Sequence, residues 1–131
     1  MGDTCEHVVV SKSGCGAVLT SVSGTVESSQ FSKGYYPNDE DCYWLIQGPP
    51  SSKIGVTFHS FDVDDEGDCQ WCTCDYLEAK VYGFEKVGQR FCGSYVRPIH
   101  HNFSSLLLHF HADDTWSMNS GLKFSYHIIQ M

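Results

Sequence analysis

Apolar and polar residues alternate along most of the chain, in short runs separated by clusters of Gly, Pro, Asn, Asp and Ser. A period of two residues is typical of strands with one buried face, and no helical period of convincing length occurs. The runs expected to form strands are residues 25–27, 42–46, 56–61, 75–82, 89–92, 105–111 and 122–129. Residues 93–102 are expected to form a loop. The pattern predicts an all-β fold, a β-sandwich.

The alternation also predicts which side chains form the core. The residues expected to point inward are Leu106, Leu108 and Phe110 in one strand and Leu122, Phe124, Tyr126 and Ile128 in another. His109 and His111 alternate with the first group, so they lie on the outer face of the same strand. We interpret them as solvent-facing polar residues of an antiparallel sheet.

Length and net charge limit the number of domains and the kinds of partner that this chain can have. The chain has 131 residues, which suffices for one core that buries roughly 65–70% of the unfolded surface. We expect an N-terminal extension at residues 1–14 and one domain at residues 15–129. A net charge of −8 argues against a nucleic-acid partner and favours a basic or metal-bearing partner. No run approaches the ~20 apolar residues of a membrane span, so we expect no membrane insertion.

Seven cysteines in so short a chain predict an oxidising compartment and therefore secretion. The first ten residues, MGDTCEHVVV, have neither the basic region nor the long apolar run of a signal peptide. We therefore expect the chain to start at a mature or excised domain. The sequon Asn102-Phe103-Ser104 makes Asn102 a candidate glycosylation site.

An acidic loop lies between two of the expected strands. Its carboxylates are Asp62, Asp64, Asp65, Glu66 and Asp68, and Asp75 follows. A sandwich could bring Asp75 and Asp113 beside this loop. Without a counter-ion such carboxylates repel one another, whereas Ca²⁺ takes six to eight oxygen ligands. Spacing alone leaves two interpretations open, a calcium site and a solvated acidic loop.

Many residues in this order resemble the CUB domain family over about residues 15–129. The matching anchors are Cys15-Gly16, Tyr36-Pro37, Cys42-x-Trp44, Phe58 with Phe61-Asp62-Val63-Asp64, Cys72-x-x-Asp75-Tyr76-Leu77-Glu78, Cys92-Gly93, Phe110-x-x-Asp113 and Gly121 to Tyr126. The resemblance implies a β-sandwich of two antiparallel sheets with two disulfides. It also implies an extracellular, non-catalytic interaction module, and many such modules bind calcium.

The resemblance further implies a metal site and a partner site. The positions that match the family's calcium ligands are Asp64, Asp75 and Asp113, with a tyrosine nearby. Counting from Cys42 selects Tyr36 and counting from Ser28 selects Tyr35; the following Pro37 favours Tyr36. The family usually has Glu where Asp64 stands, so water, Asp65 or Glu66 would fill the gap. A Lys or Arg of the partner would bind these carboxylates, and His111, Asp114 and Trp116 would border the surface.

The resemblance also implies two disulfides. One joins Cys15 to Cys42, and the other joins Cys92 to Cys69 or Cys72, of which strand register favours Cys72. Cys5, Cys69 and Cys74 would then remain, and one further disulfide among them leaves an odd thiol available for intermolecular pairing. An alternative is a zinc site at Cys69-x-x-Cys72-x-Cys74, where the spacing is similar to that of zinc ligands.

No sequence feature favours catalysis. The chain has no nucleophile elbow and no phosphate-binding glycine loop, and we expect it not to be an enzyme. Three functions of different class remain. The first is calcium-stabilised protein recognition. The second is a calcium-independent module similar to spermadhesins, which self-associates into a homodimer and binds carbohydrate or lipid head groups. The third is a structural module assembled through its odd cysteine.

Overall fold

The computed structural model describes residues 16–28, 31, 34–36, 38–64, 72–80, 88–94, 96–113 and 119–130. Its described strands are β1 (Ala17–Leu19), β2 (Ser23–Glu27), β3 (Glu40–Gln47), β4 (Ser52–Asp62), β5 (Tyr76–Lys80), β6 (Gln89–Phe91), β7 (Ile99–His101), β8 (Ser105–Ala112) and β9 (Gly121–Gln130). The extension predicted at residues 1–14 lies outside the described residues. No helix in the described part of the chain is long and apolar enough to span a bilayer.

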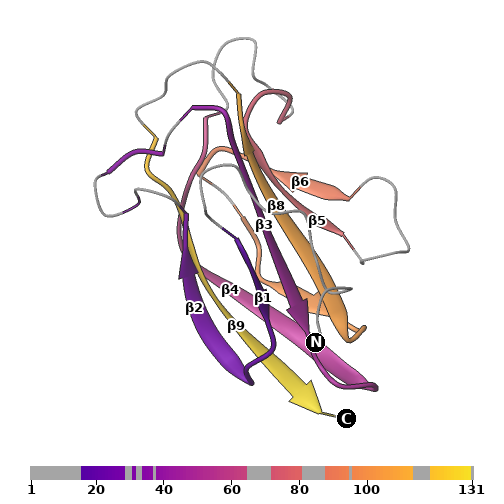
Figure 1. Cartoon of the computed structure of the whole chain (residues 1–131). Helices are drawn as coiled ribbons and strands as arrows, with labels where there is room; N and C mark the ends of the chain where they lie inside the picture. The colour runs from indigo at the N-terminus through magenta and orange to yellow at the C-terminus, as the bar shows by residue number, and fades with distance from the viewer. Residues whose placement is uncertain are drawn as a thin grey trace.

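The strands form two sheets that pack face to face (Figure 1). The five-stranded sheet has the order β1-β3-β8-β5-β6 and the four-stranded sheet has the order β2-β9-β4-β7. Strands β1 and β3 pair in parallel, and the remaining pairs are antiparallel. The predicted fold class, a sandwich of two antiparallel sheets, is therefore confirmed, with one parallel pair at an edge.

The core lies between the sheets and is built by alternation. In β8 every second side chain, Leu106, Leu108 and Phe110, is buried, and each such residue contributes about 1.5–3 kcal/mol by leaving water. Across the interface the Trp44 ring packs edge-on against Phe124, with ring centroids 5.6 Å apart. The inward faces predicted for these strands are therefore present.

The expected strands are present, with ends that differ by a few residues, but the predicted loop at residues 93–102 is wrong in part. It contains β7, which pairs with β4 from Ile54↔His101 to Val56↔Ile99. The three residues of β7 are too few to show an alternation of apolar and polar positions, so only the pairing with β4 identifies the strand. Strand β4 also carries an irregularity at His59, between Phe58 and Ser60, which changes the side-chain alternation there.

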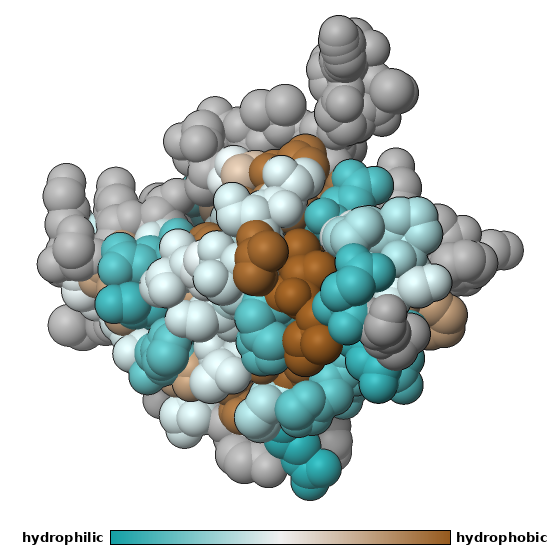
Figure 2. Space-filling model, turned by 90° about the horizontal axis from the view of Figure 1, so that it is seen from below, coloured by the Kyte–Doolittle hydropathy of each residue, from teal (hydrophilic) through white to brown (hydrophobic). Residues whose placement is uncertain are grey.

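One end of the sandwich collects the residues of interest. Strands β4 and β8 end there and β3 and β5 begin there, because neighbouring strands run in opposite directions (upper end of Figure 1). Figure 2 views the opposite end, where a narrow band of hydrophobic residues is bordered by hydrophilic ones. The upper end therefore brings together chain segments that are far apart in the sequence.

Candidate functional site

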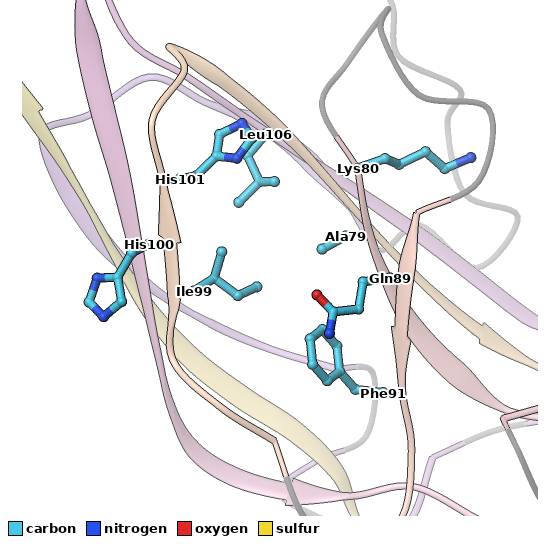
Figure 3. Close-up of a pocket in the computed structure, with 8 residues that line it drawn as sticks. All are labelled: Ala79, Lys80, Gln89, Phe91, Ile99, His100, His101 and Leu106. Atoms are coloured by element: carbon cyan, nitrogen blue, oxygen red, sulfur yellow. The ribbon is translucent and has the colours of Figure 1, made fainter.

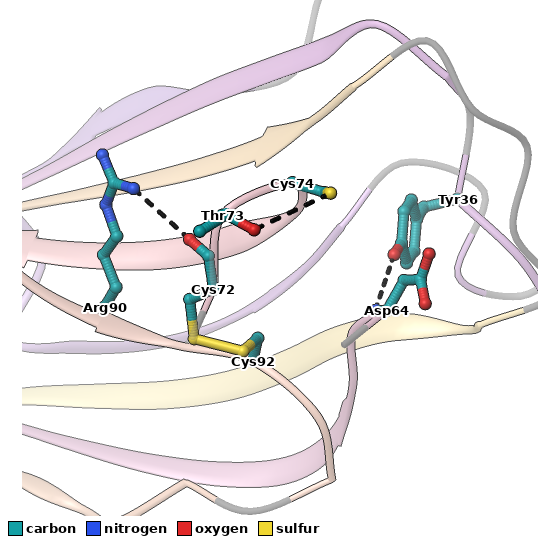
Figure 4. The surroundings of a disulfide bond; sticks show 7 residues. All are labelled: Tyr36, Asp64, Cys72, Thr73, Cys74, Arg90 and Cys92. Atoms are coloured by element: carbon teal, nitrogen blue, oxygen red, sulfur yellow. Dashed lines mark hydrogen bonds between the residues drawn. A yellow bond between two sulfur atoms is a disulfide. The ribbon is translucent and has the colours of Figure 1, made fainter. Parts of the chain in front are cut away.

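The Tyr36 hydroxyl lies at the centre of the upper end. It donates a hydrogen bond to Asp75 Oδ2 at 2.6 Å and accepts one from the Asp64 backbone N–H at 2.9 Å (Figure 4). The other carboxylate oxygen of Asp75 accepts a bond from the Asp113 backbone N–H at 2.9 Å. These four residues, which we call the acidic end, come from four segments of the chain. The structure thus brings together Tyr36 and the three predicted metal ligands.

The position of Tyr36 is set by packing. The side chain is buried and meets Phe110 edge-on, with ring centroids 5.1 Å apart, and its backbone N–H donates to Asn119 O at 3.2 Å. Gly121 has a φ of 100°, which favours glycine, and a Cβ at this position would clash with Ser28. The glycine therefore allows the start of β9 to pass close beside Ser28, which lies between β2 and the tyrosine segment of the chain.

Asp75 is an uncommon carboxylate because it is 1% exposed. Burial raises its pKa above the ordinary value, and the nearby charge of Asp113 raises it further, although the bonds from Tyr36 and the Asp113 N–H act in the opposite direction. Among the described residues, no lysine or arginine forms an ion pair with Asp75. A buried carboxylate beside a second acidic residue, without a described basic partner, is an environment that a bound cation would stabilise.

In this structure the carboxylates of the acidic end do not form a compact set of metal ligands. In the described part of the chain, the carboxylates of Asp64, Asp75 and Asp113 do not have oxygens that all lie within 4.8 Å of one another. Asp62 has a different role, since its oxygens accept bonds from the Asn119 amide at 2.6 Å and the Ser120 N–H at 3.1 Å. It fixes the segment that leads into β9. The three carboxylates of the acidic end would therefore have to move closer together to bind one ion.

Several other candidate residues can also be placed. Tyr35 is 39% exposed, so it is Tyr36 that lies against Asp64 and Asp75. Asn102 is exposed in the loop between β7 and β8, and its glycosylation remains a prediction. Candidates that lie outside the described residues are Asp65, Glu66, Asp68, Asp114 and Trp116.

The described cysteines are all disulfide-bonded. Cys72 pairs with Cys92, with Cα atoms 5.4 Å apart (Figure 4), so Cys72 rather than Cys69 is the partner of Cys92. Cys42 and Cys74 are bonded as well. The predicted partner of Cys42, Cys15, lies outside the described residues, as do Cys5 and Cys69. The alternative zinc site at Cys69, Cys72 and Cys74 is wrong, because cysteines in disulfides offer no thiolate.

A second polar cluster lies on the outer face of the five-stranded sheet. Asp41 Oδ1 is 2.7 Å from His109 Nε2 and 2.8 Å from His111 Nδ1. The interpretation as a solvent-facing residue is wrong for His109, whose side chain is only 12% exposed, whereas the His111 side chain is 31% exposed. Burial lowers the pKa of His109 below the ordinary value, although the bond to Asp41 acts in the opposite direction. The sequence reasoning missed Asp41.

The ionisation of Asp41 follows from the same contacts. Partial burial raises its pKa, but the hydrogen bonds and Coulombic interactions with His111 and His109 together outweigh burial and leave the pKa below its ordinary value. Asp41 is therefore a carboxylate at neutral pH, and both imidazoles lie against its charge.

A cavity of about 220 Å³ opens between β5 and β6 of one sheet and β7 of the other (Figure 3). The residues that line it are Ala79, Lys80, Gln89, Phe91, Ile99, His100, His101 and Leu106. His100 points away from its centre, while Ile99 and Phe91 face each other across it. These lining residues include no carboxylate, so we assign neither a metal nor acid–base chemistry to this cavity.

Comparison with known proteins decides the family. The family model described as CUB domain matches residues 15–126. The chain belongs to the CUB domain family. CUB domains are in general non-catalytic recognition modules of extracellular proteins, and the matched segment is such a module rather than an enzyme.

Relatives of this CUB domain include parts of much longer proteins. It is 36% identical over 91 residues to tolloid-like protein 1 of Homo sapiens, which covers 66% of this chain and 9% of that protein. It is 25% identical over 129 residues to blastula protease 10 of Paracentrotus lividus, which covers 98% of this chain and 21% of that protein. The matched part of this chain thus spans only 9% and 21% of the length of these two relatives.

Solved structures agree with the fold. The MASP-1 CUB2 domain, whose crystal structure is described as bound to Ca²⁺, superposes with a TM-score of 0.74 at 27% identity, covering 86% of this chain and 98% of that one. The CUB1-EGF-CUB2 segment of human MASP-1/3 superposes with a TM-score of 0.75 at 29% identity, covering 87% of this chain and 42% of that one.

Proposed function

We propose that this CUB domain is a secreted, calcium-stabilised module for protein recognition, whose acidic end binds Ca²⁺ through Asp64, Asp75 and Asp113. The observation that carries the proposal is the Asp75 carboxylate. It is 1% exposed, its pKa is raised by burial and by Asp113, and no described lysine or arginine pairs with it. A divalent cation would compensate this charge, and the oxygen donors are of the kind that Ca²⁺ prefers.

The fold supports this assignment in two ways. The Tyr36 hydroxyl and the Asp113 N–H already orient the two oxygens of Asp75, so little ordering of that side chain is required on binding. The structural neighbour MASP-1 CUB2, at 27% identity, is described as bound to Ca²⁺. Asp64 is an aspartate with a short arm, so water or a neighbouring carboxylate would complete its part of the coordination.

The same surface would recognise the partner. A carboxylate that is fixed by a metal and by hydrogen bonds is a strong acceptor for a Lys or Arg side chain, and the net charge of −8 favours a basic approach. The partner would thus be an extracellular protein that places a basic residue against Tyr36, Asp64, Asp75 and Asp113. Trp116 would border this contact.

Thermal unfolding in Ca²⁺ and in chelator tests the calcium part, on wild type and on Asp75→Asn. At a hundredfold excess over the dissociation constant, binding to the native state stabilises by about 2.7 kcal/mol, or roughly 10 °C for a domain of this size. Asp75→Asn should abolish this rise. In chelator the variant should melt close to wild type, because the removal of a buried charge offsets the loss of a hydrogen bond.

Glu27→Gln is the matched control. Glu27 is a carboxylate of β2 whose side chain is 46% exposed and lies 3.7 Å from Lys123 Nζ, so its replacement removes one charge without touching the acidic end. It should keep the full response to Ca²⁺. Superposable melting curves of the wild type in Ca²⁺ and in chelator would disprove calcium binding, and an unchanged response in Asp75→Asn would disprove its location.

A further inference from the structure

The second polar cluster carries an inference that is independent of the calcium site. Asp41 lies in β3 and His109 and His111 lie in β8, on the outer face of the five-stranded sheet. In the ladder Asp41 is the direct partner of His111, and Tyr43 is the partner of His109. The two histidines share a face because side chains alternate along a strand. Register alone therefore places two imidazoles and one carboxylate together.

The distances fit a small metal ion. Asp41 Oδ1 is 2.7 Å from His109 Nε2 and 2.8 Å from His111 Nδ1, and the three candidate ligand atoms all lie within 4.8 Å of one another. A tetrahedral zinc ion with bonds of 2.0–2.2 Å requires its ligand atoms to be about 3.3 Å apart. An ion could therefore replace the two hydrogen bonds after small shifts of the side chains, which would lengthen each oxygen–nitrogen separation by roughly half an ångström.

The surrounding side chains hold the imidazole rings in place. The Tyr43 ring stacks on His109, with centroids 4.2 Å apart and planes at 9°. Tyr76 from β5 packs against both histidines, with centroid separations of 5.9 Å and 5.1 Å. Ligands on paired strands, with rings fixed by aromatic neighbours, form a more precise site than ligands on loops.

The electrostatic environment also favours a cation. Asp41 is ionised, and the buried Glu78 of β5 is the ladder partner of His109. The positive charges near Glu78 are Lys80 and Arg90, whose nitrogens lie 3.6 Å and 3.5 Å from its oxygens. Lys80 and Arg90 thus lie against the carboxylate of Glu78, whereas the carboxylate of Asp41 faces the two imidazoles. A divalent ion between Asp41 and the histidines would meet attraction from Asp41.

The donor atoms select the class of metal. Two imidazole nitrogens and one carboxylate oxygen suit Zn²⁺ and its neighbours among the transition metals, whereas Ca²⁺ takes oxygens. The side chains of Asp41 and His111 are 30% and 31% exposed, so the outer side of the cluster is open to solvent. A fourth ligand could come from water or from a protein docked on this face.

We propose that Asp41, His109 and His111 form a binding site for a divalent transition-metal ion, with Zn²⁺ the best fit, on the outer face of the five-stranded sheet. The site is separate in chemistry from the acidic end, although His111 precedes Asp113 by only two residues. It would give this recognition module a second metal-dependent surface. Its existence does not depend on calcium binding.

Calorimetric titration with ZnCl₂ tests the proposal, in a buffer with excess Ca²⁺ and without reductant, so that the acidic end is saturated and the disulfides stay intact. Wild type should bind one Zn²⁺ per chain. His111→Gln and Asp41→Asn should each weaken binding by at least roughly tenfold, since even residues that only support metal ligands have effects of this size. Co²⁺ in place of Zn²⁺ should give the visible absorption of a tetrahedral complex, which the same variants lose.

His100→Gln is the matched control, because His100 is exposed on β7 in the other sheet; it should bind Zn²⁺ like wild type. Asp41→Asn and His111→Gln are chosen over His109 because their side chains are partly exposed and the fold should tolerate the changes. Circular dichroism and thermal melting without zinc will show whether both variants are folded. Absence of saturable binding to wild type would overturn the proposal, as would equal affinity of wild type and the two variants.

Discussion

At the scale of single residues, the Tyr36 hydroxyl should determine the stability of the acidic end. It donates to Asp75 Oδ2 at 2.6 Å and accepts from the Asp64 N–H at 2.9 Å. Tyr36→Phe would leave a buried carboxylate and a backbone N–H each short of one partner. We expect the free energy of unfolding to fall by about 1–3 kcal/mol, measured by urea denaturation in chelator.

Tyr35→Phe provides the comparison for this measurement. The Tyr35 side chain is 39% exposed, and the same loss of a hydroxyl there should change the free energy of unfolding by less than about 0.5 kcal/mol. Equal losses of stability in the two variants would show that the hydrogen bonds of the Tyr36 hydroxyl to Asp75 and Asp64 do not stabilise the fold.

The residues of the two clusters differ in how far the sequence predicts them. Tyr36, Asp64, Asp75 and Asp113 stand in motifs whose order resembles a known family, so they could be named before the structure. Asp41 has no such motif. Its bonds to His109 and His111 span 68 and 70 residues, and only the register of β3 against β8 brings them together. A shift of one residue would move Asp41 to the other face of the sheet.

At the scale of elements, strand β6 should depend on one arginine. The Arg90 guanidinium lies 3.9 Å above the Tyr76 ring, its Nε is 3.5 Å from Glu78 Oε2, and its Nη1 donates to the Cys72 carbonyl at 3.3 Å. Lysine keeps the charge but not the planar group that makes these contacts together. Because the side chain is 41% exposed, Arg90→Lys should cost only about 0.5–1 kcal/mol.

Hydrogen exchange localises this effect. The amides of β6 that pair with β5, from Leu77↔Phe91 to Ala79↔Gln89, should exchange faster in Arg90→Lys. The amides between β3 and β8, in the same sheet but on the other side of β5, should keep wild-type protection. Uniformly faster exchange across the sheet would show that Arg90 supports the whole sandwich and not the edge strand alone.

Strand length explains which elements the sequence could predict. Strands β8 and β9 have eight and ten residues, so several alternating apolar positions identify each of them. Strand β7 has three residues, Ile99–His101, too few to display a period, and it follows Pro98 in a segment that reads as a loop. Its strand geometry comes from hydrogen bonds to β4, a contact between distant parts of the sequence.

At the scale of the whole molecule, the antiparallel topology collects acidic residues from distant segments at one end of the sandwich. Four segments deliver Tyr36, Asp64, Asp75 and Asp113 to this end, and the Cys72–Cys92 disulfide ties the approach to β5 to the end of β6. The outer-face cluster begins only two residues before Asp113. Both candidate metal surfaces therefore lie near one end of the sandwich, whereas the cavity lies along the side edge that β6 and β7 form.

The cysteine count makes a prediction for the intact chain. Seven is an odd number, and Cys42, Cys72, Cys74 and Cys92 are all disulfide-bonded, so at least one cysteine without a partner in the same chain must be Cys5, Cys15 or Cys69. We expect alkylation of the unfolded, unreduced monomer to label an odd number of cysteines, with peptide mapping to place the label on this group of three. Label on any of the four bonded cysteines would contradict the prediction.

A dimer on a non-reducing gel that disappears with reductant would show that the unpaired cysteine joins two chains, as the assembly of a structural module requires. If the protein instead stays monomeric and carries the label, its thiol is available to a different partner and recognition does not depend on covalent self-association.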